Sequence, residues 1–197
     1  CGKTSLINLI PRFYEPTEGQ IRIDGIPVEQ LKLYDLRKQI GLATQDVLLY
    51  SDTIEGNIAY GDDSIKMNEV VKFARYSAAA DFISKMPEGY DTLVGERGVG
   101  LSGGQKQRIS LARALAIRPS VLILDDTTSA VQQSLRELDF PCTKIVIAQR
   151  ISTTKTADKI IVLQNGYIEE MGTHEELMEK KGYYYELVKL QTGVDEL

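Results

Sequence analysis

The sequence lacks the features that would place the chain outside the cell, within a membrane or on nucleic acid. Only two of its 197 residues are cysteine, without metal-ligand spacing, so a reducing cytosol is the simplest compartment. No apolar run approaches the length of a transmembrane helix and no signal peptide is visible, so we expect the chain itself not to span a membrane. The formal net charge of −5 argues against nucleic acid as the main partner.

The length and composition are those of a globular domain. The chain is long enough for one sizeable α/β core, or for a core with a small subdomain. Two short apolar runs, at 121–124 and 145–148, read as strands buried on both faces, as in a parallel sheet covered by helices.

The most informative stretch is the octet at 101–108, Leu-Ser-Gly-Gly-Gln-Lys-Gln-Arg. Ser102 can cap a helix, Gly103 and Gly104 let a ligand approach the backbone closely, and a helix-compatible run follows from Gln105. The free amides and the helix dipole then face an anion. Ser-Gly-Gly alone fits an ordinary capped helix equally well, but the whole octet resembles the signature motif of the ABC ATPases and is highly specific.

The first residues resemble the end of a phosphate-binding loop, in which a glycine and four residues precede Gly-Lys-Ser/Thr. Gly2, Lys3 and Thr4 supply the last three, while the first glycine and its preceding strand have no counterpart. We therefore expect the chain to begin inside its own P-loop. By this motif Lys3 would reach the β- and γ-phosphates of ATP, Thr4 would ligate Mg²⁺, and Ser5 would lie near the α-phosphate.

Two strand ends carry further candidates. Asp125 and Asp126 follow the apolar run 121–124, where α/β sheets place their ligands, and adjacent carboxylates there are rarely structural. We assign Asp125 as the Mg²⁺-linked acid of the Walker B position. The strand expected at 40–44 leads to Gln45. A lone glutamine is usually a solvated loop residue, but in the ABC family a glutamine here contacts Mg²⁺ and the attacking water.

These motifs occur in the order and rough spacing of an ABC nucleotide-binding domain, and the resemblance covers essentially the whole chain. It implies an α/β fold: a P-loop NTPase (RecA-like) core with a mainly parallel sheet, an antiparallel β subdomain and an α-helical signature subdomain. We take residues 1–197 as a single ABC ATPase domain, with the helical subdomain at about 46–117.

Three segments resemble exporters in particular, at 53–58, 94–98 and 172–177. The resemblance implies ATP and Mg²⁺ as ligands, and a position at the cytoplasmic face of the cell membrane against the transmembrane domains of an exporter. It also implies a head-to-tail dimer with a second ABC ATPase domain. Each ATP then lies between the Walker motifs of one domain and the signature of the other, and hydrolysis needs a glutamate after the Walker B aspartate and a switch histidine.

The sequence departs from the family at both of these catalytic positions. Asp126 stands in place of the glutamate, and its carboxylate falls back by roughly 1 Å, a misplacement that can cost ~10²-fold in rate. Gln149 replaces the histidine and cannot carry a positive charge. The only histidine, His174, is expected in a capped helix elsewhere. We therefore predict that the chain belongs to one half of a heterodimeric exporter with one degenerate ATP site. We assign Asp126, Gln149 and Gln45 as its catalytic positions.

Two alternatives stay open at this point. One is an ordinary homodimeric exporter ATPase that tolerates both changes. The other is a non-transport ABC ATPase, although such proteins carry a long coiled-coil insertion or two ATPase domains, which this sequence lacks.

The interval after residues 127–130, which resemble the start of a D-loop, is short. Only 13 positions separate Gln132 from Ile145, whereas family members carry a helix longer by roughly two turns. Either the helix is trimmed or residues are missing from the sequence. We favour missing residues, because the bracketing motifs are intact, and we assign Gln132 no role.

Overall fold

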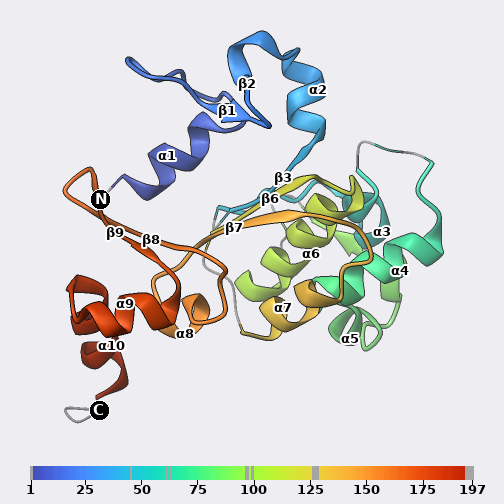
Figure 1. Ribbon diagram of the computed structural model, residues 1–197. Helices are drawn as coiled ribbons and strands as arrows, with labels where there is room; N and C mark the ends of the chain where they lie inside the picture. Colours follow the sequence, from blue (N-terminus) through green and yellow to red (C-terminus); the bar gives the residue numbers. More distant parts are fainter. Residues whose placement is uncertain are drawn as a thin grey trace.

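A parallel sheet runs through the middle of the domain in the computed structural model, which describes residues 2–44, 46–60, 62, 64–95, 98, 100–125 and 129–193 (Figure 1). Within these ranges the sheet has the strand order β3 (Ile40–Ala43), β6 (Val121–Asp125) and β7 (Thr143–Ile147). Ala43 pairs with Leu124, and Leu124 with Val146, so the three strands end at one edge. The predicted mainly parallel α/β core is confirmed.

The other helices and strands surround this sheet. In chain order they are α1 (Lys3–Leu9), β1 (Arg22–Ile23), β2 (Ile26–Pro27), α2 (Leu33–Lys38), β4 (Asp52–Thr53), α3 (Ile54–Ile58), α4 (Met67–Tyr76), α5 (Ala80–Ile83), β5 (Leu93–Val94), α6 (Gly103–Ala116), α7 (Ser129–Ser134), α8 (Ile151–Thr154), β8 (Ile160–Gln164), β9 (Tyr167–Gly172), α9 (His174–Lys180) and α10 (Tyr183–Thr192). Within the described ranges, no helix has the length and apolar content needed to cross a bilayer.

Strand β6 is apolar on both faces because each face is covered by helices. Leu122 and Leu124 belong to the core cluster that contains α6, whereas Ile123 belongs to the cluster that contains Ile7 of α1. All three β6 residues are fully buried. Successive side chains of a strand point to opposite faces, so the continuous apolar run reflects a three-layer arrangement.

The expected antiparallel strands form around two Asx-Gly turns. Asp24 and Gly25 join β1 to β2 with φ of 51° and 79°, and Asn165 and Gly166 join β8 to β9 with φ of 50° and 85°. Positive φ at both central residues is the type I′ geometry, which matches the twist of a hairpin. The two antiparallel pairs thus have a local cause in the sequence of their turns.

The segment expected to be helical packs into one apolar cluster. Val70 and Phe73 of α4, Ile83 of α5 and Ile109 of α6 are almost fully buried within it. Helix α6 stops at Ala116, three residues before Pro119, because proline disfavours helix at the residue before it and provides no amide. The helical nature of this region agrees with the sequence, while its limits as a subdomain stay a prediction.

We predict that Gly41→Ala destabilises the domain. A Cβ at Gly41 would lie 2.6 Å from the Ala114 carbonyl oxygen and 2.9 Å from Pro119 Cγ, so α6 and β3 would have to separate. Overpacking of this kind typically costs about 1–3 kcal/mol of unfolding free energy. Gly103→Ala is the matched control, since its Cβ would meet no atom within 4 Å. Urea denaturation followed by circular dichroism measures both, and equal midpoints would contradict this packing.

Candidate functional site

Two of the predicted positions, Asp125 and Gln149, lie at the C-terminal edge of the parallel sheet. Asp125 is the last residue of β6 and pairs with Ile147 of β7. Gln149 follows Ile147 by two positions and is exposed. Gln45 and Asp126 lie outside the described residues, but their neighbours Thr44 and Asp125 stand at this edge. Parallel registration therefore brings the ends of β3, β6 and β7 together.

The donor set at this edge suits Mg²⁺ bound together with phosphate. Asp125 is half-buried and offers hard carboxylate oxygens, the ligands that Mg²⁺ prefers. Among the described residues, no three His, Cys, Asp or Glu side chains cluster as a metal site. Mg²⁺ is commonly held by one or two carboxylates and by substrate phosphates rather than by an all-protein cage, so the residues present fit that mode.

The N-terminus of α1 can receive an anion. Gly2 precedes the helix with φ 82° and ψ 7°, a left-handed conformation suited to glycine, and no described side chain caps the first turn. Lys3 is half-buried, whereas Thr4 and Ser5 are exposed. A groove of about 690 Å³ runs between this turn and the β8–β9 hairpin, and Gly2, Thr4 and Ser5 line part of it. The structure thus leaves the predicted phosphate-binding residues accessible.

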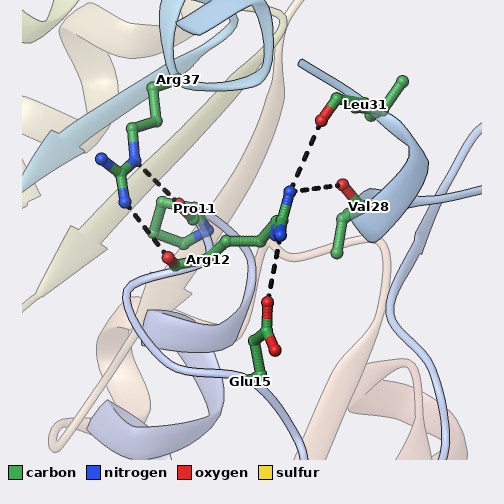
Figure 2. A network of polar contacts seen from close by, with 6 residues as sticks. All are labelled: Pro11, Arg12, Glu15, Val28, Leu31 and Arg37. Atoms are coloured by element: carbon green, nitrogen blue, oxygen red, sulfur yellow. Dashed lines mark hydrogen bonds and ion pairs between the residues drawn. The ribbon is translucent and has the colours of Figure 1, made fainter. Parts of the chain in front are cut away.

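Two arginines fasten the far end of α1 (Figure 2). Arg37, near the end of α2, donates from Nε to the Pro11 carbonyl and from Nη2 to the Arg12 carbonyl, each at 3.1 Å. Because β3 begins three residues after Arg37, this side chain ties the end of the P-loop helix to the strand that leads towards Gln45.

Arg12 continues the same network in the opposite direction. Its Nη1 donates to the carbonyls of Val28 and Leu31 at 3.3 and 3.5 Å, and its Nη2 pairs with Glu15 at 3.0 Å (Figure 2). The segment after β2 is therefore attached to the end of α1. Sequence reasoning missed both arginines, because their partners are main-chain carbonyls 16 to 26 residues away and no local pattern marks them.

The signature helix begins with the cap that the sequence predicts. Ser102 Oγ accepts from Gln105 N–H at 3.3 Å, and Gln105 Oε1 accepts from Ser102 N–H at 2.8 Å, which completes a capping box. The helix starts at Gly103, two residues earlier than the run from Gln105, because both glycines join its first turn. Gly103 and Gly104 are exposed, and a Cβ at either position would meet no atom within 4 Å beyond its own helix backbone.

Arg108 holds this exposed first turn in place. Its Nε donates to the Gly104 carbonyl at 3.1 Å, and its Nη1 donates to the Ala78 carbonyl at 3.2 Å. The guanidinium also lies 4.8 Å from the centroid of the Phe82 ring, within cation–π range. The start of the signature helix is thus positioned against α5 and the turn before it.

A second network joins the segment after Gln45 to the signature helix. Arg113 of α6 donates to the Asn57 carbonyl and side-chain oxygen at 2.8 and 2.7 Å, and to the Leu48 carbonyl at 2.8 Å. Burial lowers the pKa of the Arg113 guanidinium from its ordinary value. Asn57 is fully buried and also bonds both main-chain groups of Tyr50. No sequence signal identified these residues, whose contacts span up to 65 positions.

His174 lies away from the sheet edge, as expected. It is the first residue of α9, behind a capping box formed by Thr173 and Glu176. Its Nδ1 lies 2.9 Å from the hydroxyl of Tyr184. The side chain is thus part of the packing between α9 and α10.

A central parallel sheet covered on both faces, with candidate ligands at the carboxyl ends of its strands, defines an α/β nucleotide-binding domain of the P-loop NTPase class. The model of the ABC transporter family matches residues 1–129, about two thirds of the chain, and the chain belongs to this family.

Relatives and a solved structure agree with this assignment. The chain is 48% identical to an ATP-dependent lipid A-core flippase of Syntrophus aciditrophicus, covering 100% of this chain and 34% of the flippase. It is 50% identical to a multidrug export ATP-binding/permease protein of Staphylococcus aureus, and the match covers 96% of this chain and 34% of that protein. The structure of a bacterial Atm1-family ABC exporter with ATP bound superposes on this chain with a TM-score of 0.92 at 40% identity. The superposition covers 100% of this chain and 36% of the exporter chain. The chain spans about a third of the length of these curated relatives.

The match to the flippase also bears on the short interval after the D-loop segment. It extends over 204 positions, whereas this chain has 197 residues, so the flippase has at least seven residues without a counterpart here. Seven residues are about two helical turns. In this chain α7 and a 3₁₀ turn at Leu135–Glu137 fill the interval, with Val131 and Leu135 buried in the core. That residues are missing between Gln132 and Ile145 stays our prediction, because the length of the match does not place these seven residues.

We predict that Arg37→Lys lowers stability by about 1–2 kcal/mol, because an ammonium group cannot reproduce the two-nitrogen fork on the Pro11 and Arg12 carbonyls. Arg22→Lys is the control, since Arg22 donates from two nitrogens to a single atom, Gln20 Oε1, two residues away at the exposed surface. Thermal unfolding compares the two variants. An equal and negligible shift for both would show that Arg37 does not fasten α1.

Proposed function

We propose that this chain is the ATP-binding domain of an ABC exporter and powers export from the cytoplasmic face of the cell membrane. It binds ATP with Mg²⁺ and pairs head-to-tail with a second ABC ATPase domain, a different chain, beneath the exporter's transmembrane domains. Its own Walker site binds ATP and hydrolyses it slowly. Its signature helix completes the competent site on the partner.

The residues for ATP binding are the accessible ones at the start of α1 and the edge of the sheet. Lys3 would pair with the β- and γ-phosphates, and the amides that follow Gly2 would receive the phosphate oxygens. Thr4 and Asp125, with Gln45, would hold Mg²⁺. When bound, Mg²⁺ neutralises charge on the phosphates and on the departing group.

The proposal of slow ATP hydrolysis rests on one observation. The same chain has Asp126 and Gln149 at the two catalytic positions and an intact signature motif. Hydrolysis requires a water oxygen to attack the γ-phosphorus while a carboxylate orients that water and accepts its proton. The shorter Asp126 side chain places its carboxylate farther from this water. Gln149 can donate a hydrogen bond to the γ-phosphate but adds no positive charge as negative charge develops.

The start of the signature helix is suited to a ligand from outside the chain. The Lys106 amide makes the first α-helical hydrogen bond, to the Ser102 carbonyl at 3.0 Å, so the Gly103 and Gly104 amides lie before the first intrahelical donor. Both glycines are exposed, while Arg108 fixes the turn that carries them. A preorganised, exposed helix N-terminus can therefore receive the phosphates of ATP held by another domain.

The decisive variants restore the two catalytic positions. In the assembled exporter, with the partner's own site inactivated, Asp126→Glu combined with Gln149→His should raise ATP hydrolysis by at least about tenfold, since a misplaced catalytic group can cost ~10²-fold. Adding Lys3→Ala should abolish the gain, which locates it at this Walker site. Steady-state phosphate release measures the rates.

Two results would contradict the proposal. No gain from the restored pair, with the protein folded and ATP still bound, would show that Asp126 and Gln149 do not limit hydrolysis. Brisk hydrolysis by the unmodified chain on its own would show that its site is fully competent, as in an ordinary homodimeric ATPase.

A further inference from the structure

The C-terminal helix holds the main chain at the switch position. Gln191 of α10 donates from Nε2 to the Gln149 carbonyl at 2.9 Å, and its Oε1 accepts from the Ile151 amide at 2.8 Å. One side-chain amide thus satisfies a carbonyl and an amide two residues apart, as a neighbouring strand would. Both contacts fall between the end of β7 and the start of α8, where the strand ladder has ended.

Helix α10 is itself firmly anchored. Tyr184 is 1% exposed, and its hydroxyl lies 3.1 Å from Thr154 Oγ1 at the end of α8. Its amide donates to the buried Glu170 carboxylate at 2.7 Å, and Val188 packs with Ile151 in the same apolar cluster. Residues 184, 188 and 191 lie on one helical face, so the face that packs on α8 also presents Gln191.

The clamp holds the main chain at Gln149 and leaves its side chain without such a contact to Gln191. The main chain is held by one hydrogen bond at the Gln149 carbonyl and a second at the Ile151 amide, while the Gln149 side chain is exposed at the edge of the sheet. Without the clamp, this exposed strand-to-helix connection would exchange those bonds for water and sample further backbone angles. A fixed backbone limits the directions in which the side chain at position 149 can extend.

We propose that Gln191 is a positioning residue for the ATP site, acting through the main chain of Gln149 to aim that side chain at the γ-phosphate. The inference rests on the proposed role of Gln149 as the switch residue. Because the clamp contacts only main-chain atoms at position 149, it operates equally when that residue is glutamine or histidine.

The first test is hydrogen–deuterium exchange of the peptide that contains the Ile151 amide, in the assembled exporter. Gln191→Leu removes both hydrogen bonds and should accelerate exchange there at least about tenfold. Gln191→Glu keeps an acceptor for the Ile151 amide but removes the donor to the Gln149 carbonyl, so it should protect Ile151 better than leucine does. Leu190→Ala, at a side chain that is 80% exposed on the same helix, is the matched control. Exchange in Gln191→Leu equal to the control overturns the clamp.

The second test asks whether the clamp serves the γ-phosphate. Photolabelling of this chain with azido-ATP and azido-ADP measures the two affinities. Gln191→Leu should weaken ATP binding by about tenfold and leave ADP binding unchanged, because only ATP carries the γ-phosphate. In a Gln149→Ala background, Gln191→Leu should cause no further loss.

The outcomes separate this inference from the proposed function. If Gln149→Ala reduces the preference for ATP and Gln191→Leu does not, the positioning role is wrong while the switch role of Gln149 stands. If Gln149→Ala leaves the preference unchanged, the switch role is wrong and the positioning role falls with it, whatever the exchange measurement shows of the clamp.

Discussion

The burial of β6 between two layers of helices fixes the position of Asp125 at the sheet edge. Leu122 and Leu124 pack towards α6, and Ile123 packs towards α1. A slip of the strand into the core would draw Asp125 into the layer of Leu124, which is fully buried, and an unpaired buried carboxylate is very costly. The apolar run therefore holds the Asp125 carboxylate at the surface of the core. Strands β3 and β7 end at the same level because both pair in parallel with β6.

Features that depend on neighbouring residues could be predicted from the sequence. The capping boxes at Ser102 and Thr173, the Asp24–Gly25 hairpin and the apolar run of β6 each have a local physical cause, and each is present. The arginine networks and the Gln191 clamp join segments far apart in the chain, which only the folded topology brings together. Propensity and spacing carry no information about such contacts. The roles of Gln45 and Asp126 stay predictions, because both lie outside the described residues.

The long-range contacts share a physical pattern. Arg37 holds the end of α1, Arg108 joins the start of α6 to Ala78, and Gln191 holds the turn after β7, and each side chain donates to a main-chain carbonyl far away in the sequence. None of these contacts depends on the side chain at the position that is held. In our proposal this arrangement lets the side chain at position 149 change while the main chain that carries it stays in place. Slow hydrolysis on the Walker side and a working signature helix are then compatible within one domain.

The central claim is that ATP held by this chain turns over slowly while its signature helix serves the partner. Trapping with orthovanadate and azido-ATP tests this directly, since it marks the chain whose Walker site has completed a hydrolysis step. After turnover by the assembled exporter and separation of the two chains, we expect the label on the partner and little on this chain. Label on this chain equal to that on the partner would contradict the account.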